Sequence, residues 1–445
     1  MKHLHVFKNI MVMSSIAISA QMAQALISDK GSNRVEIQMS NVDLNHILSS
    51  EKSESDEATV RIFKDGQLVQ EARIGVQNRG QTSLREFARK NLSIKIDKSD
   101  LNDNEHVKKL KIGEVKSKKL ILSAGPEDTL LIKNQIGYAL LKKIGLTSLE
   151  NDYAELLLNG KSYGLYMVTD NPGDYMIKEK EADVVFRRRY NDDIELKDAK
   201  KSLSDSDILE AQQQLTRIHK KITKLTGQRF IEEISAQLNL KNYMKWMALN
   251  YILKNGDYVD EVYFYGKKQA HGQMYFDISP WDLDDTFSDK MHLAQVPTFP
   301  NNSMQEESAK QLIYNYEGRI DLAIARDPVL LEMYFQNMEE VVQQLSKDVV
   351  DAEFAKISDK VAVYMMDRDV QKNGQLDVSK QSNEPFVILE DLNAKKNFIN
   401  ARIQSIKSEL EKIKMESPEN RKLRLNAFQL FFIKMNNALL RYFTK

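Results

Sequence analysis

The sequence predicts an α+β protein with two lobes, the first rich in strands and the second rich in helices. Apolar residues alternate with polar ones over much of residues 58–170, which is the period of a half-buried strand. From about residue 205 to the C-terminus, apolar residues recur at helical spacing instead. Acidic residues gather at loop ends in the second part. This layout is typical of a two-lobed enzyme, although it names no reaction.

The strand-rich part begins with a strand at 35–39 and a polar stretch. Two hairpins are predicted from the turn dipeptides Asp65-Gly66 and Asn159-Gly160. Each dipeptide tolerates positive φ and lies between two runs of alternating apolar and polar residues. Other expected elements of this part are strands at 92–96 and 120–122 and a helix at 132–144.

In the helix-rich part, apolar stripes predict helices at 208–225 and 240–254, and a third hairpin is expected at 262–276. A further stripe at 399–413 is the plainest helix of the C-terminal region. The predicted domains are a signal peptide at 1–25, an N-terminal strand and polar linker at 26–57, a strand-rich N-lobe at 58–180 and a helix-rich C-lobe at 181–445.

Composition excludes several classes of function. The 445 residues contain 64 basic and 64 acidic side chains, so no overall charge attracts nucleic acid or anionic lipid. Without any cysteine, the chain has no disulfides, cysteine nucleophile or thiolate metal site. After the first 25 residues, no apolar run approaches the 18 or so residues that suggest a membrane span. We therefore expect neither a nucleic-acid partner nor a stable membrane span.

The N-terminus has the three zones of a secretory signal peptide. Lys2 and Lys8 flank a stretch without acids, a short apolar run follows at 10–20, and Ala23 and Ala25 supply small residues for cleavage. The alternative is a buried N-terminal helix. The pattern predicts export to the periplasm or the extracellular space.

The first candidate site is the acidic loop at 280–286, directly after the third hairpin. Asp282 and Asp284 are oxygen ligands of the kind that Mg²⁺ or Ca²⁺ prefers, and carboxylates so close together repel unless a cation or donors compensate. The alternative is a capped helix N-terminus, where Asp is also favoured.

The second candidate is the loop at 255–262, where Asp257 and Glu261 follow the helix at 240–254. The alternative is an ordinary turn, because Asn255-Gly256 is a common turn dipeptide.

The third candidate is basic. Arg79 precedes a glycine turn and Lys90 opens the next strand, so this turn could bind phosphate or could simply be exposed to solvent.

Other common sites are missing. The chain has no GxxxxGK[ST], GxSxG or HExxH motif, and its seven histidines lack metal-ligand spacing.

The order of these clusters resembles the CotH kinase family, the atypical kinases related to spore coat protein H, over residues 58–290 and more loosely in the C-terminal helices at Phe398 to Arg402. The specific parts are the hairpin Asn159-Gly160 with Tyr163-Gly164-Leu165-Tyr166, and the sequence Pro280-Trp281-Asp282-Leu283-Asp284. The succession also contains Arg79-Gly80 to Ser83, Lys90, Leu122-Ser123, Asp128, Lys133-Asn134 and Asn255-x-Asp257.

The resemblance implies a kinase-like two-lobed fold that binds ATP with Mg²⁺ or Mn²⁺ and phosphorylates Ser or Thr of exported proteins. Within it, Lys90 corresponds to the lysine that holds nucleotide phosphates, Asp257 to the catalytic aspartate and Asp282 to the metal-binding aspartate. These roles suit phosphoryl transfer, which needs positioning and neutralised charge.

Three positions depart from the family pattern. Lys133 replaces a frequent Arg, and Asp170 stands where a Glu would pair with the strand lysine. An expected Asn, a metal ligand, falls on Glu261 or Val262, and of these only Glu261 can bind a cation. A catalytically degenerate binding or assembly protein at the cell envelope or surface is therefore the alternative, and a metal-dependent phosphohydrolase is a third interpretation.

The signal pattern predicts a mature N-terminus near Leu26. Mass spectrometry of the protein from its native host should find no peptides from residues 1–25 in the mature form. Intact Met1 in cytosolic protein would contradict export.

Overall fold

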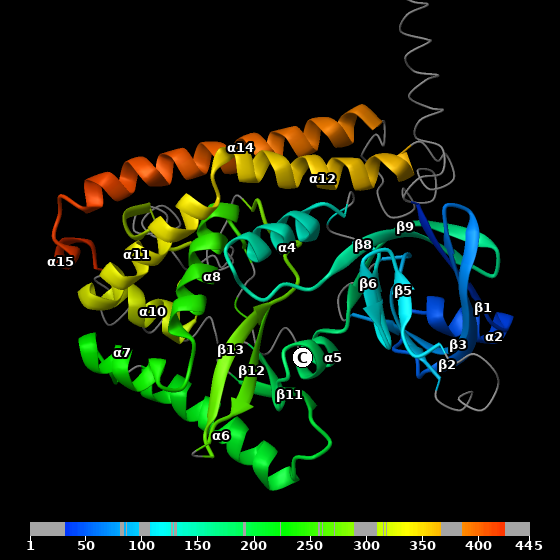
Figure 1. Cartoon of the computed structure of the whole chain (residues 1–445), viewed down its shortest axis with the longest axis horizontal. Coiled ribbons are helices and arrows are strands. Elements are labelled where there is room, and N and C mark those ends of the chain that lie inside the picture. The colour runs from blue at the N-terminus through cyan, green and yellow to red at the C-terminus, as the bar shows by residue number, and fades with distance from the viewer. Residues whose placement is uncertain are drawn as a thin grey trace, which may run out of the picture. The chain divides into compact units, whose positions relative to one another are not determined.

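The computed structural model describes residues 32–422, except 81–83, 86, 98–106, 126–127, 129–130, 190–192, 223, 257–258, 260, 271, 289–308, 315, 317 and 366–384. The predicted signal peptide lies outside the described residues. The chain forms two compact units (Figure 1). The first comprises Met1–Thr129, Asn151–Thr169 and Lys356–Leu389, and the second comprises Leu130–Glu150, Asp170–Ala355 and Glu390–Lys445.

A closed barrel of seven strands forms the first unit. Its order around the barrel is β1 (Asn33–Gln38), β2 (Asp56–Lys64), β3 (Gln67–Arg79), β4 (Asn91–Ile96), β7 (Lys119–Ser123), β9 (Lys161–Asp170) and β8 (Asn151–Leu158). Neighbouring strands are antiparallel, except that β1 pairs in parallel with β8 to close the barrel. The short strands β5 (Leu110–Ile112) and β6 (Val115–Ser117) form a separate ribbon.

Alternating apolar side chains fill the barrel, as the period of two in the sequence predicts. Each of these side chains is at most 1% exposed: Val35, Ile37, Val60, Ile62, Ile74, Val76, Leu92, Ile94, Leu120, Leu122, Leu156 and Leu158. Closure also removes the open strand edges that an unclosed sheet would expose.

The two predicted hairpin turns of this unit are confirmed. Asp65 and Gly66 have φ of 53° and 76°, and Asn159 and Gly160 have φ of 47° and 80°. These left-handed pairs match the right-handed twist of the flanking strands. Besides the predicted strand, the N-terminal segment at 26–57 contains helix α2 (Asn41–Leu48), which was not predicted and whose N-cap Ser40 accepts a hydrogen bond from the Asp43 N–H.

The second unit surrounds an antiparallel sheet with helices (Figure 1). The sheet order is β11 (Ile194–Ala199), β10 (Val184–Arg188), β12 (Val262–Lys268) and β13 (Met274–Pro280). Its helices are α4 (Lys133–Lys143), α5 (Pro172–Glu179), α6 (Asp205–Ile222), α7 (Gly227–Ser235), α8 (Leu240–Leu253), α10 (Arg319–Arg326), α11 (Pro328–Gln344), most of α14 (Pro385–Ile413) and α15 (Pro418–Arg421). Helix α12 (Lys347–Met365) begins in this unit and ends in the first.

The predicted apolar stripes pack as expected. The α14 stripe is buried throughout, with exposures of 0–4% at Ile399, Ile403, Ile406, Leu410 and Ile413. Helix α8 is buried on nearly all sides, which explains why its sequence is apolar all round rather than on one face. The chain is therefore a mixed α+β protein with a strand-rich beginning and a helix-rich C-terminal part.

The division into units does not follow a single boundary at residue 180. Helix α4 belongs to the second unit, where Lys245 of α8 donates to the Ile144 carbonyl over 3.3 Å. Tyr364 near the end of α12 belongs to the first unit, where its hydroxyl accepts from the Asn33 N–H at 2.7 Å and donates to the Tyr153 carbonyl at 2.9 Å. Contacts between residues distant in sequence decide both assignments.

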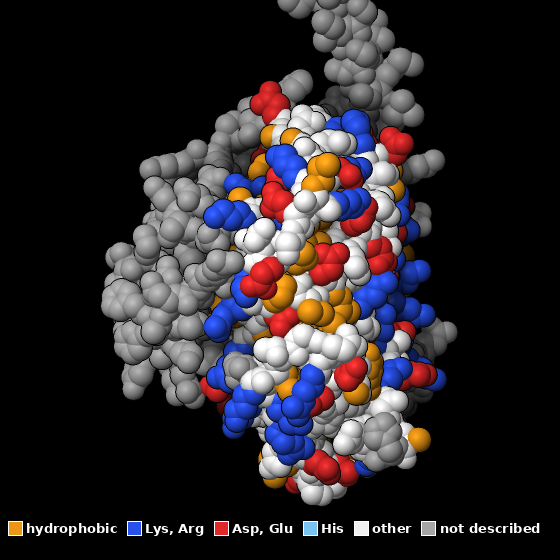
Figure 2. Space-filling view, turned by 90° about the vertical axis from the view of Figure 1, so that its left-hand side faces the viewer, with side chains coloured by type: hydrophobic (Ala, Val, Ile, Leu, Met, Phe, Trp, Pro, Cys, Tyr) orange, Lys and Arg blue, Asp and Glu red, His pale blue; other side chains and the backbone are white. Residues whose placement is uncertain are grey.

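Among the helices of the described residues, none combines the length and apolar character required to cross a bilayer. On the face that Figure 2 shows, acidic and basic side chains are intermixed over the described part of the surface.

Barrel closure predicts a specific sensitivity at Asn159. Its side chain accepts from the Met39 N–H at 2.9 Å and donates to the Met39 carbonyl at 3.0 Å, while its backbone holds a positive φ. Asn159→Ala should lower the free energy of unfolding by about 2–3 kcal/mol, because it loses both bonds and strains the turn. Asn159→Gly keeps the turn conformation and should lose about 1 kcal/mol less. Urea unfolding measures both, and equal losses would refute the role of the turn conformation.

Candidate active site

An acidic turn follows β13 and contains two of the predicted site residues. The Trp281 N–H donates to the Glu261 carbonyl at 2.9 Å, and the Thr286 hydroxyl donates to the Leu283 carbonyl at 2.8 Å. Asp282 has a φ of 50°, in the left-handed region that side chains other than glycine seldom adopt. Both Asp282 and Asp284 are partly exposed.

Helix α4 holds this turn through residues on one of its faces. Lys133 Nζ donates to the Asp284 carbonyl at 2.6 Å, and the Leu283 N–H donates to Asn134 Oδ1 at 2.6 Å. Gly137 leaves room for Leu283, since a Cβ at this position would lie 2.3 Å from Leu283 Cδ1. Positions 133, 134, 137 and 138 share a face because a helix repeats every 3.6 residues.

The acidic turn also changes the chemistry of Tyr138 on α4. Burial, followed by the negative charge of Asp282, raises the pKa of the Tyr138 hydroxyl well above its usual range. The backbone of Asp282 forms a hydrogen bond with this hydroxyl. A field of this sign favours cations over anions near the turn.

The loop after α8 lies against the acidic turn. The Gly256 N–H donates to the Asp285 carbonyl at 3.0 Å, and a Cβ on Gly256 would lie 2.2 Å from Asp285 Oδ2. The helix ends through Lys254, which has a φ of 50°, so the C-cap lies two residues before the glycine. Asp257, the predicted catalytic residue, lies outside the described residues. The two residues before it are held by backbone hydrogen bonds, from Asn255 to the Asn250 carbonyl and from Gly256 to the Asp285 carbonyl.

Helix α14 supports the same two loops. Arg402 donates to the carbonyls of Ile252 and Tyr251 at 2.9 and 2.6 Å, near the end of α8 where carbonyls lack partners within the helix. Phe398 packs edge-on against Phe287 with ring centroids 5.6 Å apart. These contacts give a structural reason for the Phe398 to Arg402 motif.

Two adjacent arginines of β10 hold the rest of the loop. Arg188 is fully buried, and its Nε donates to the Val259 carbonyl at 2.7 Å. Arg187 forms an ion pair with Glu261 Oε1 at 3.0 Å. Glu261, predicted as a metal ligand, is therefore bound by a cationic side chain. The sequence analysis missed both arginines, although three consecutive arginines at the end of a strand are a detectable signal.

The remaining predicted residues belong to both units. Lys90, in the first unit, is buried and its ammonium donates to the carbonyls of Leu84 and Phe87 at 2.7 and 2.5 Å. Arg79 ends β3 opposite Asn91. Asp170, in the second unit, is 6% exposed at the end of β9.

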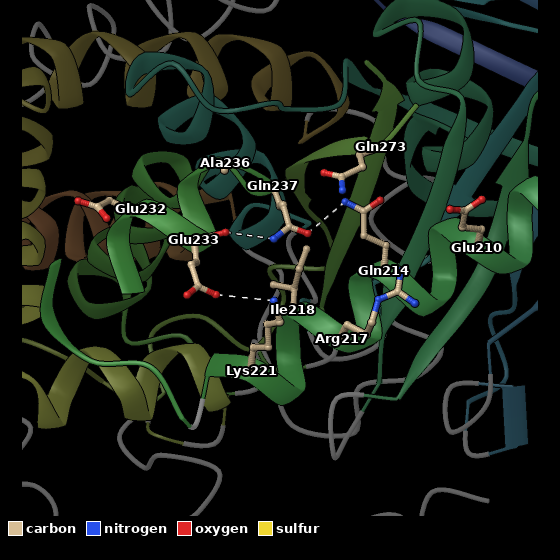
Figure 3. A pocket seen from close by; sticks show the side chains of 10 residues that line it. All are labelled: Glu210, Gln214, Arg217, Ile218, Lys221, Glu232, Glu233, Ala236, Gln237 and Gln273. Atoms are coloured by element: carbon tan, nitrogen blue, oxygen red, sulfur yellow. Dashed lines mark hydrogen bonds and ion pairs between the residues drawn. The ribbon is translucent and has the colours of Figure 1, made fainter. Parts of the chain in front are cut away.

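Among the described residues, no three His, Cys, Asp or Glu side chains come together as a metal site. A cavity of about 520 Å³ lies between α6, α7 and the start of β13, and Figure 3 shows its mostly polar lining. Gln214 and Gln237 are hydrogen-bonded to each other in its wall at 3.3 Å, and Lys221 pairs with Glu233 at 3.6 Å. None of the predicted site residues lines this cavity.

The two loops and their supporting helices lie in a region that matches a known family of kinases. The family model described as CotH kinase protein matches residues 76–406, so the chain belongs to the CotH kinase family, as its motifs predict. The chain is also similar to the inner spore coat protein H of Bacillus subtilis (strain 168), with 20% identity over 301 residues, 64% of this chain and 78% of that protein. Family membership implies atypical kinase activity, with ATP as phosphate donor and a protein as substrate.

The contact between α4 and the acidic turn predicts non-additive stability. Gly137→Ala should lower the free energy of unfolding by about 1–2 kcal/mol despite the better helix propensity of alanine, because its Cβ overlaps Leu283. In a Leu283→Ala background the same change should cost less. Urea unfolding of the two single variants and the double variant measures this coupling. An equal cost in both backgrounds would show that the atoms of Leu283 beyond Cβ do not limit position 137.

Proposed function

We propose that this protein is an exported, metal-dependent kinase that transfers the γ-phosphoryl group of ATP to Ser or Thr of other exported proteins. The observation that carries the proposal is the hydrogen-bonded pairing of two loops in a member of a kinase family. The loop that contains Asp257 joins the acidic turn through Gly256 and Asp285 on one side and through Glu261 and Trp281 on the other. A base and a metal ligand held on paired loops suit phosphoryl transfer.

The residues of the acidic turn fit Mg²⁺ or Mn²⁺. Asp282 and Asp284 offer partly exposed oxygen donors, and the field that they create extends to Tyr138. Mg²⁺ is commonly held by one or two carboxylates together with substrate phosphates, so two carboxylates suffice on the protein side. The cation would neutralise charge on the transferred phosphoryl group.

The other residues take roles that their chemistry allows. Asp257 would accept the proton of the substrate hydroxyl, which directs the oxygen toward the phosphorus atom. Lys90 and Arg79 would supply positive charge for the phosphates, and Asp170 would orient that lysine. The ammonium of Lys90 is bonded to two backbone carbonyls in this structure, so the phosphates would compete with these acceptors for its protons.

Export forms part of the proposal and is supported by the basic, apolar and small-residue zones of residues 1–25. The protein would then act in the periplasm or outside the cell, on substrates that share its compartment.

A second candidate function is a catalytically degenerate binding or assembly protein at the cell envelope or surface. The ion pair between Arg187 and Glu261 favours it, because a carboxylate engaged by a guanidinium is less available to a cation. The name of the Bacillus subtilis relative, a spore coat protein, is also consistent with a role in assembly.

The two functions make different predictions for Asp257. Purified mature protein incubated with labelled ATP and Mg²⁺ or Mn²⁺ should phosphorylate itself or an exported protein. Asp257→Asn should keep nucleotide binding and slow transfer by about a hundredfold to ten-thousandfold, because it removes the base without changing volume. This loss corresponds to about 3–5 kcal/mol of activation free energy.

The matched control is Asp260→Asn, which removes a carboxylate three residues further along the same loop and should leave transfer intact. Equal rates for wild type and Asp257→Asn would remove Asp257 as the base and make Asp260 or Glu261 the next candidate. Wild type that binds Mg²⁺ and ATP but transfers no phosphate would establish the binding function instead.

A further inference from the structure

We propose that Asn134 of α4 is a positioning residue that holds Asp282 in its metal-binding orientation, an inference that rests on the proposed function. Among the described residues, eight other than glycine have a positive φ, and three of them, Lys254, Asp282 and Phe287, lie in or beside the two paired loops. Asp adopts a left-handed conformation more readily than most residues, but the extended and right-handed helical regions remain open to it, so contacts in its surroundings must select this one. The conformation of Asp282 therefore requires a cause in its surroundings.

Asn134 supplies that cause. Asn134 Oδ1 accepts a hydrogen bond of 2.6 Å from the Leu283 N–H. This N–H belongs to the peptide group that joins Asp282 to Leu283, so the hydrogen bond fixes the rotation of that group. Asn134 is 6% exposed, which means that solvent has little access to replace its amide oxygen. Lys133 holds the turn one residue beyond Leu283 by donating to the Asp284 carbonyl.

The packing around this bond leaves the turn little freedom to adjust. Leu283 lies directly over Gly137, where there is no room even for a methyl group. The turn is therefore held by a side-chain acceptor, a side-chain donor and a close contact, all on one face of α4.

Loss of the Asn134 amide would leave the Leu283 N–H buried without its acceptor. Because buried backbone donors are almost always paired, the turn would rotate to find another partner. Asp282 would then relax from its left-handed conformation, and its carboxylate would swing away from the position in which it binds a cation. Residues that orient a metal ligand commonly change metal affinity by 10–100-fold when they are removed.

The test is the affinity of the mature protein for Mn²⁺ in the presence of ATP, followed by electron paramagnetic resonance of free Mn²⁺. Asn134→Ala should weaken Mn²⁺ binding about tenfold. Hydrogen exchange of peptides that cover residues 281–286 should become faster in the same variant. A purely structural role would lower the melting temperature without changing the affinity of the folded protein for Mn²⁺.

The matched control is Asn337→Ala on α11. Asn337 is also 6% exposed, and its amide donates to the Met333 carbonyl at 2.8 Å, within its own helix. This variant loses a buried amide of the same size and should leave both Mn²⁺ affinity and exchange at 281–286 unchanged. Asp282→Ala removes the ligand itself and should abolish Mn²⁺ binding. This variant therefore gives the lower limit of Mn²⁺ affinity with which Asn134→Ala is compared.

Unchanged Mn²⁺ affinity in folded Asn134→Ala would overturn this inference and leave the proposed function intact. Wild type that binds no Mn²⁺ with ATP would overturn both. If Asn134→Ala does not fold, Lys133→Met tests the same face of α4, since it removes the donor to Asp284. A smaller but measurable loss of Mn²⁺ affinity is then expected, and unchanged affinity in that variant would refute the role of α4.

Discussion

A fully buried guanidinium, that of Arg188, ties together the main elements of the second unit. It donates to the Tyr243 hydroxyl at 2.6 Å as well as to the Val259 carbonyl, and Tyr243 in turn donates to the buried Asp321 at 2.8 Å. The rings of Tyr243, Trp246 and Phe264 surround the cation. A charge without water is tolerated only where such partners compensate it, and removing one partner of a buried pair costs about 3–5 kcal/mol. Strand β10, helices α8 and α10 and the loop after α8 must therefore take up one mutual arrangement.

This constraint extends to the acidic turn. The loop held by Arg188 is hydrogen-bonded to the turn that contains Asp282, and α4 and α14 hold these two loops through Asn134 and Arg402. Contacts with residues distant in sequence thus surround the two left-handed residues Lys254 and Asp282. Functional sites often store strain in this way, because a fixed ligand needs no reorganisation when it binds.

The family pattern and this geometry differ at Glu261. The family pattern implies a metal ligand near that position, whereas the structure places the carboxylate beside Arg187. The same ion pair helps to hold the loop, so the departure from the family pattern has a structural role whatever its effect on catalysis. None of these residues lines the polar cavity between α6 and α7.

Local features of the sequence determined a large part of the fold. The turns at Asp65-Gly66 and Asn159-Gly160, the barrel strands and the α14 stripe depend on backbone preferences and on periodicity, and both can be recognised within a short segment. The family and the two acidic loops were also evident from motifs. Helix α2 and strands β10 and β11 were not predicted, because each is short, and β10 in particular has its apolar residues in one run without alternation. The tertiary structure alone decided the assignment of α4 to the second unit, the pairing of Arg187 with Glu261 and the contact between Asn134 and Leu283. Asn134 and Leu283 are 149 residues apart, and no local preference of the chain encodes a contact that forms only after both elements have packed.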